Sequence, residues 1–275
     1  MDKTALGDRM KMYEALEAGR QFIPLLPIYA RLDGRCFRAF THGMQRPYDQ
    51  RMHSLMDSVT QFLVEETQAA CGYTQSDEIS LCWYSDDIKS QVFFNGKIQK
   101  MCSVLAALCA AKFAELCLAD FDDFLAERWL EKIPVFDCRI LTLPNKAECA
   151  NQFVWRTIDA TRNSVSMAAN HYYSPKKLHK KDIKQQQEML FEKGVNWNDY
   201  PLRFKEGMFF QKRKVLRDLS QEEMKRIPPQ HRPSGPIERT DVIKIGIRKF
   251  KAVENKVEFI FDGADPILPK ERSDD

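Results

Sequence analysis

The sequence predicts an α+β fold in which an antiparallel, ferredoxin-like sheet carries helices on one face. Two observations support this fold class. Short apolar segments typical of strands alternate with amphipathic segments through residue 170, and the strand-helix-strand, helix-strand order fits a ferredoxin-like layer. The other face of the sheet is expected to be free for chemistry. The 275 residues, 44% hydrophobic and 29% charged, are typical of a globular chain with a substantial core.

The first predicted strand, residues 23–32, contains Pro24 and Pro27, which favour a leading or edge position. A loop containing Gly34 follows. Apolar residues spaced three and four apart between residues 52 and 63 then predict an amphipathic helix packed on the sheet. The remaining elements of this half are strands at 79–84 and 135–143 and helices at 98–118 and 146–170.

After residue 170 the sequence changes to lysine-rich segments. This change predicts a catalytic domain over 1–170 and a basic C-terminal extension over 171–275. Residues 171–251 hold 20 Lys or Arg against 10 Asp or Glu, although the whole chain has a net charge of only +3. This asymmetry favours contact with nucleic-acid phosphates, but charge runs are also commonly solvated faces. Strands are predicted in the extension at 204–216, 242–250 and 257–261. The basic residues expected to contact RNA are Lys176, Lys177, Lys180, Lys181, Lys212 and Arg213.

Compartment and membrane association are predicted from the cysteines and the apolar runs. The eight cysteines are dispersed among apolar neighbours without a C-x-x-C pair, so they are interpreted as reduced core thiols rather than disulfides or zinc ligands. The uncharged apolar run 101–111 is much shorter than the roughly 20 residues of a membrane span, and no secretory signal opens the chain. A cytoplasmic protein without a membrane partner is expected.

Acidic residues stand at the ends of two predicted strands. Asp33 directly follows the first strand, and Asp77 and Glu78 open the strand at 79–84. Carboxylates on neighbouring strands can meet at the edge of a sheet and bind divalent cations through oxygen, which is the arrangement of two-metal phosphoryl transfer. Asp-Gly is also a common turn dipeptide, and Asp77 and Glu78 could simply be solvated. The pattern alone leaves both interpretations open.

Several segments resemble the tRNA-histidine guanylyltransferase family. They read RLDGRCF at 31–37, RPYD at 46–49 and GYTQSDEIS at 72–80. Two later segments, WRxxDATRNS at 155–164 and GVNWNDYP at 194–201, resemble its bacterial and phage branch, the guanylyltransferase-like 3′-to-5′ polymerases. The resemblance spans roughly residues 8–214, and the ordered set of motifs is far more specific than any one of them.

The resemblance implies a polymerase-palm domain that adds nucleotides to the 5′ end of tRNA. The 5′ monophosphate would first be adenylylated with ATP, after which the 3′ hydroxyl of an incoming nucleotide, with GTP as the first candidate, attacks that phosphate. Two Mg²⁺ ions are implied, with Asp33, the carbonyl of Gly34 and Asp77 as ligands and Glu78 as an adjacent catalytic carboxylate. A homotetramer is implied as well.

Nucleotide-binding residues are also implied by matching motif positions. Arg46 stands where the family usually has Lys, just before a helix whose N-terminus adds backbone donors for phosphate. Ser76 can donate a hydroxyl hydrogen bond. The implied nucleotide-binding set is Arg35, Cys36, Phe37, Arg46, Asp49, Ser76, Lys100 and Arg139.

One departure from the family pattern bears on the substrate. Enzymes devoted to tRNA-histidine carry a His-Ile-Asn-Asn motif where this chain has TRNS at 161–164, so only Asn163, an implied tRNA contact, is retained. Templated repair of 5′-truncated tRNAs is therefore favoured over dedicated guanylate addition. Trp155 is interpreted as a core anchor in preference to a base-stacking residue. The alternatives are a non-catalytic RNA-binding module and a palm-like enzyme acting on free nucleotides.

Overall fold

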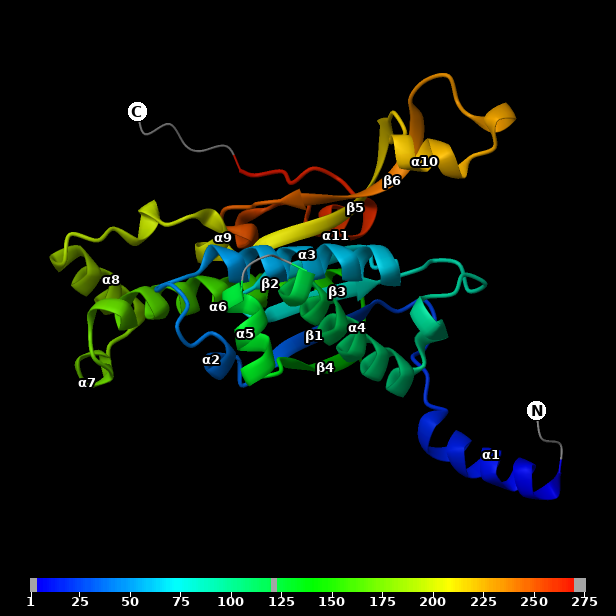
Figure 1. The fold of residues 1–275 in the computed structure, drawn as a ribbon, viewed down its shortest axis with the longest axis horizontal. Helices are drawn as coiled ribbons and strands as arrows, with labels where there is room; N and C mark the ends of the chain where they lie inside the picture. Colours follow the sequence, from blue (N-terminus) through cyan, green and yellow to red (C-terminus); the bar gives the residue numbers. More distant parts are fainter. Residues whose placement is uncertain (1–3, 120–122, 270–275) are drawn as a thin grey trace.

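A computed structural model describes residues 4–119 and 123–269. Its centre is one antiparallel sheet of six strands, in which each strand pairs with its neighbours in the opposite direction (Figure 1). The α+β, palm-like antiparallel fold predicted from the sequence is thereby confirmed. In spatial order the strands are β4 (Val135–Thr142), β1 (Ile28–Arg35), β3 (Glu78–Trp83), β2 (Cys71–Gln75), β5 (Met208–Arg217) and β6 (Ile237–Ile245).

Helices cover both faces of the sheet, so the expectation of one free face is wrong. The helices of the described residues are α1 (Ala5–Ala18), α2 (Phe37–Phe40), α3 (Gln50–Thr67), α4 (Ile98–Ala119), α5 (Asp123–Glu131), α6 (Lys146–Tyr172), α7 (Pro175–Leu178), α8 (Ile183–Glu192), α9 (Leu202–Glu206), α10 (Gln221–Arg226) and α11 (Lys256–Asp262). Short 3-10 turns lie at η1 (Phe93–Gly96), η2 (Trp197–Asp199), η3 (Pro229–His231) and η4 (Phe250–Ala252).

Two apolar cores result from the alternation of side chains along the strands. Ile28 and Leu32 of β1 face α3 and α4, where they join the larger core. Tyr29, between them in sequence, faces the other way and packs with Phe153 of α6 and Phe259 of α11. Sequence patterning missed this second core because its buried strand residues come from four strands and form no continuous apolar run. They are Tyr29, Cys71, Tyr73, Cys82 and Phe209.

Helix α3 is amphipathic, as its apolar spacing predicts. Its buried stripe includes Met56, Val59 and Leu63, all fully inaccessible to solvent. The helix begins at the N-cap Asp49, whose side chain accepts a hydrogen bond from the backbone N–H of Arg51 at 2.9 Å. It therefore starts directly after the RPYD segment, and the cap fixes where that segment meets the sheet.

Helix α4 has the length and the apolar composition needed to cross a membrane, which the shorter run 101–111 did not suggest. Every fourth residue from Met101 to Cys117 is buried and belongs to the larger core, and the helix contacts β4 and α3. Core helices of soluble proteins have the same composition, so the resemblance to a span is a weak indication. That the protein has no membrane partner stays a prediction.

The chain beyond residue 170 continues the same sheet. β5 pairs with β2, and β5 and β6 form a long hairpin whose far end carries α10 (Figure 1). The two-domain division near residue 170 stays a prediction. The predicted strand 204–216 begins only at Met208, after α9, and the predicted strand 242–250 lies instead at Ile237–Ile245.

Two further element predictions need correction. The segment 257–261, predicted as a strand, is helix α11, which ends at Gly263 with a left-handed φ of 74°; a short apolar run does not distinguish a buried helix from a strand. β1 begins at Ile28 rather than at residue 23 because the proline-containing segment before it forms a turn. All eight cysteines are free, as predicted, although Cys36 is exposed rather than part of the core.

Gly72 lies where α3 crosses β2. A Cβ atom at this position would be 2.6 Å from Cγ2 of Val64 and 3.0 Å from Cγ2 of Thr60. We expect Gly72→Ala to lower the free energy of unfolding by about 1–3 kcal/mol through overpacking, measured by urea denaturation. The matched control is Gly235→Ala, since no atom lies within 4 Å of a Cβ there. Superimposable unfolding curves for the two variants would contradict this account of the contact.

Candidate active site

The structure brings Asp33 and Asp77 to one end of the sheet. Asp33 lies near the end of β1, where it is the antiparallel partner of Glu78. Asp77 lies in the turn between β2 and β3, and its backbone carbonyl accepts a hydrogen bond from the N–H of Gly34 at 3.1 Å. The predicted convergence of the two aspartates is confirmed, whereas their roles stay predictions.

The electrostatics of this corner disfavour negative charge on Asp77. Burial raises the pKa of the Asp77 carboxyl, the hydroxyl of Ser76 partly offsets this by a 3.0 Å hydrogen bond to Oδ1, and the charge of Asp33 raises the pKa further. A backbone hydrogen bond also lowers the pKa of Asp77, but among the described residues no ion pair compensates the charge of Asp33 or Asp77. A bound cation would stabilise the charged form of both carboxylates.

Glu78 is compensated by the protein itself. Arg156 of α6 donates two hydrogen bonds to its carboxylate, at 2.6 Å and 2.7 Å, and a third to Asp159 at 2.8 Å. Burial raises the pKa of Glu78, and the hydrogen bonds and charge of Arg156 oppose that shift. Arg156 and Asp159 of the 155–164 motif are thus part of a buried hydrogen-bonded network, and the Glu78 carboxylate is already paired with Arg156.

Trp155, next to this ion pair, is not the core anchor predicted from the sequence. Its side chain is 53% exposed and lies on the surface of α6. The guanidinium groups of Arg156 and Arg31 lie 4.6 Å and 5.4 Å from its ring centroids. The two neighbouring arginines lie over the ring and stabilise it at the surface.

A cavity of about 320 Å³ opens beside Asp77. It is lined by the loop before α3, the first turns of α2 and α3, the β2–β3 turn and Met167 of α6. The predicted residues that line it are Phe37, Arg46, Asp49, Ser76 and Asp77. The sequence did not single out Arg38, Thr41, Gln45 or His53, which also line the cavity. Only their short sequence distance from the RPYD motif could have indicated them.

Two of the predicted nucleotide-binding residues hold the cavity wall together. The ring of Phe37 is buried in the larger core against Phe113 and Phe136. Asp49 accepts hydrogen bonds from the side chain of Arg51 and from the backbone N–H of Gln45, and these contacts, the Arg51 side chain first, lower its pKa to about 2. Both residues fix the loop that surrounds the cavity.

The other predicted nucleotide-binding residues do not line this cavity. Arg35 and Cys36 are exposed at the end of β1 and directly after it. Lys100 lies at the start of α4, 4.7 Å from the Phe94 ring, and lines a different hollow together with Lys97. Arg139 is exposed on the edge strand β4, where its Nε lies 3.7 Å from Oδ1 of Asp137.

The predicted RNA contacts fall into two groups. Four lysines, Lys176, Lys177, Lys180 and Lys181, are exposed on and after α7, at the end of the molecule that also carries α8 (Figure 1). Lys212 and Arg213 of β5 have partners within the fold, the side chains of Gln68 at 2.5 Å and Asp265 at 2.8 Å respectively. Asn163 is exposed on α6 and donates to Asp159 at 3.1 Å.

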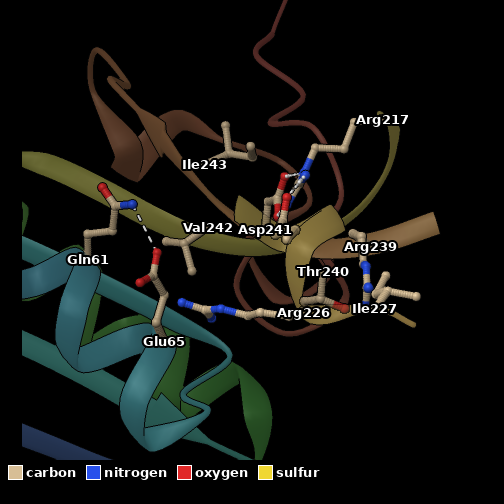
Figure 2. Close-up of a pocket in the computed structure, with 11 residues that line it drawn as sticks. Gln61, Glu65, Arg217, Arg226, Ile227, Arg239, Thr240, Asp241, Val242 and Ile243 are labelled. Atoms are coloured by element: carbon tan, nitrogen blue, oxygen red, sulfur yellow. Dashed lines mark hydrogen bonds and ion pairs between the residues drawn. The ribbon is translucent and has the colours of Figure 1, made fainter. Parts of the chain in front are cut away.

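A larger cavity, about 610 Å³, lies between α3 and the β5–β6 hairpin (Figure 2). None of the predicted site residues lines it. Arg217 is held by Glu223. It also donates to Asp241, and Gln61 donates to Glu65 at 2.9 Å (Figure 2). Acidic and basic side chains balance around this cavity, so it lacks the excess positive charge that a triphosphate requires.

A palm-like sheet with two aspartates at one end suits nucleotidyl transfer, and the comparisons assign the chain to the nucleotidyltransferase class. The family profile described as tRNAHis guanylyltransferase matches residues 7–144, and the chain belongs to this family. Helix α6 and the β5–β6 hairpin lie beyond the matched residues.

Individual relatives support the assignment. An uncharacterised protein of Acanthamoeba polyphaga mimivirus is 32% identical over 78% of this chain and 79% of its own length. The tRNA(His) guanylyltransferase of Kluyveromyces lactis is 26% identical over 72% of this chain and 88% of its own length. A solved bacterial tRNA(His) guanylyltransferase-like protein in complex with ATP is 33% identical, with a TM-score of 0.69 over 76% of this chain and 87% of that one. A second solved bacterial relative, in complex with GTP, is 27% identical, with a TM-score of 0.68 over 92% of this chain and 99% of that one.

Removing Arg156 should destabilise the fold because it leaves Glu78 buried without its partner. We expect Arg156→Met to lower the free energy of unfolding by about 3–5 kcal/mol. The double variant with Glu78→Gln should recover part of this stability, since it removes the uncompensated charge. Arg162→Met, an exposed position on the same helix, serves as the control. Equal thermal midpoints for Arg156→Met and the wild type would show that the ion pair contributes nothing.

Proposed function

We propose that this protein adds nucleotides in the 3′-to-5′ direction to the 5′ end of tRNA and that templated repair of 5′-truncated tRNAs is its use. The observation that carries the proposal is the convergence of Asp33 and Asp77 beside a cavity large enough for a nucleotide. Membership of the tRNAHis guanylyltransferase family supplies tRNA as the partner. The TRNS segment at 161–164 is the reason for preferring repair to dedicated guanylate addition.

The proposed reaction has two phosphoryl transfers. An oxygen of the tRNA 5′ monophosphate attacks the α-phosphorus of ATP, and pyrophosphate leaves. The 3′ hydroxyl of the incoming nucleotide, GTP in the first instance, then attacks the activated 5′ phosphorus, loses its proton, and AMP leaves. The solved bacterial relatives in complex with ATP and with GTP make these two nucleotides the natural candidates.

Two magnesium ions fit the residues present at this corner. Mg²⁺ typically takes one or two carboxylates and completes its shell with water and substrate phosphates, so Asp33, Asp77 and the Gly34 carbonyl suffice. No group of three or more His, Cys, Asp or Glu side chains gathers as a metal centre within residues 4–119 and 123–269, and this donor set does not require one. The ions would neutralise charge on the phosphate oxygens and polarise them for attack.

The protein's own residues position the substrate. The Ser76 hydroxyl orients the Asp77 carboxylate through its hydrogen bond. Arg38 and Arg46 contribute positive charge to the cavity lining, where a triphosphate would lie. Arg156 keeps Glu78 in place behind the two aspartates. We assign the exposed lysines on and after α7 to tRNA phosphates and, by family resemblance, propose a cytoplasmic homotetramer.

The aspartates are tested by 5′ extension of a tRNA that lacks its first nucleotide, with labelled nucleotides and Mg²⁺. We expect Asp33→Ala and Asp77→Ala each to reduce extension by more than about 10³-fold, roughly the effect of removing a group that stabilises charge in the transition state, and to leave RNA binding intact. Asp218→Ala, exposed directly after β5, is the control. Normal extension by either aspartate variant would refute the site.

The same assay separates the rival functions. RNA retention without extension by the wild type would identify a binding module. Turnover of nucleotides that needs no RNA would identify a palm-like enzyme acting on free nucleotides. Extension that stops after a single guanylate, whatever the opposite base, would favour dedicated guanylate addition over templated repair.

The exposed lysines on and after α7 are tested by the salt dependence of tRNA binding. We expect Lys180→Ala combined with Lys181→Ala to weaken binding and to reduce the slope of log affinity against log salt by about 2, one for each lysine that no longer neutralises a phosphate. The charge-matched control combines Lys89→Ala with Lys132→Ala, both exposed and outside the basic extension. An equal change of slope in both pairs would mean that net charge alone governs binding.

A further inference from the structure

His53 is one of the buried polar residues of α3. It is only 6% exposed and lines the cavity beside Asp77. Other buried polar residues of the helix have partners: the Thr60 hydroxyl donates to the Met56 carbonyl at 2.6 Å, and Asp57 is held by Arg203 at 2.6 Å. Among the described residues, Nδ1 of His53 is one of the few buried side-chain nitrogens without a hydrogen-bond partner.

An unpaired buried nitrogen is costly, so it calls for an explanation. A histidine that served packing alone could be replaced by the leucines and methionines that fill the rest of this stripe. The ring instead stands at a cavity wall, where a bound molecule could supply the missing partner. The described fold therefore leaves one nitrogen of His53 without a hydrogen-bond partner beside this cavity.

The orientation of the imidazole is fixed by its neighbours. It stacks on the ring of Tyr48 with centroids 5.3 Å apart and planes 3° from parallel. Tyr48 also lines the cavity and is held from behind by Phe204 and Tyr200, at centroid distances of 4.9 Å and 6.1 Å. A ring held between helix and aromatic cluster can present a hydrogen bond in a constant direction, as specific recognition requires.

The imidazole is neutral at physiological pH. Burial and the nearby charge of Arg203 lower the pKa of His53 to about 4, Lys244 acts in the same direction, and Asp57 and Asp49 oppose them. A neutral imidazole carries one N–H donor and one acceptor nitrogen. It therefore adds no charge for phosphate and is suited to a neutral partner with a defined hydrogen-bonding edge.

We propose that His53 is a specificity-determining residue that donates a hydrogen bond from its imidazole N–H to N7 of a purine nucleoside triphosphate bound in this cavity. N7 is an acceptor that adenine and guanine share, so one donor accommodates both ATP and GTP. This inference rests on the proposed function, because it assigns the base-recognising part of the same site. Arg38 and Arg46, in the same lining, remain for the triphosphate.

The test removes each partner of the hydrogen bond in turn. Calorimetry measures binding of GTP, ATP, 7-deaza-GTP, which lacks N7, and inorganic tripolyphosphate to the wild type and to His53→Leu. For the wild type we expect 7-deaza-GTP to bind about tenfold more weakly than GTP. For His53→Leu we expect the same tenfold weakening for GTP and ATP, no further weakening for 7-deaza-GTP, and tripolyphosphate binding within about twofold of the wild type.

Two further variants make the result interpretable. His53→Gln, which keeps an N–H donor, should recover part of the affinity for GTP even if the leucine variant does not fold. His42→Leu, an exposed histidine of the preceding loop, should match the wild type for every ligand. Equal wild-type affinity for GTP and 7-deaza-GTP, or equal weakening of both in His53→Leu, would overturn the inference.

Failure of the inference and failure of the proposed function give different results. A wild-type protein that extends tRNA 5′ ends and binds GTP, but does not distinguish it from 7-deaza-GTP, retains the function and loses only the role of His53. A wild-type protein that binds none of the nucleotides and extends no tRNA loses both.

Discussion

The antiparallel register of β1 with β3 is the constraint on which the site depends. It places Asp33 opposite Glu78 and allows the N–H of Gly34 to reach the carbonyl of Asp77. A slip of one residue would turn every side chain of the strand to the other face. Because Ile28 and Leu32 must face α3 and α4 while Tyr29 faces α6, packing on both faces excludes that slip. The register, and with it the pairing of the aspartates, is specified by two cores at once.

The ion pair of Glu78 with Arg156 extends this constraint from the sheet to α6. A buried ion pair is not in itself a large source of stability, since desolvation offsets much of the attraction. Its value here is positional. Arg156 and Asp159 lie on one face of a helix that runs from the inner strands to the lysine-bearing segment after Tyr172. The direction of α6 therefore relates the position of the carboxylates to that of the surface assigned to RNA.

Sequence reasoning found the aspartates because their signal is local. Asp33 and Asp77 each adjoin a strand, and the position of a strand end within a sheet limits where a side chain can lie. It failed where the deciding contact is distant. Arg156 pairs with a residue 78 positions earlier, and Trp155 is exposed because arginines from two elements flank it. The segment that forms α11 carries an apolar run too short for its period to separate helix from strand.

His53 could not have been found from the pattern for a related reason. On an amphipathic helix a histidine among apolar residues indicates only a buried position, and its unused nitrogen becomes visible only once every neighbour is placed. The neighbours come from far along the chain: Asp57 is bound by Arg203 of α9 and, at 2.7 Å, by Lys244 of β6. These residues and the aromatic rings behind Tyr48 belong to the basic half, yet they support the wall of the cavity. Residues of the half assigned to RNA thus help to hold α3 and Tyr48, which form part of the cavity wall.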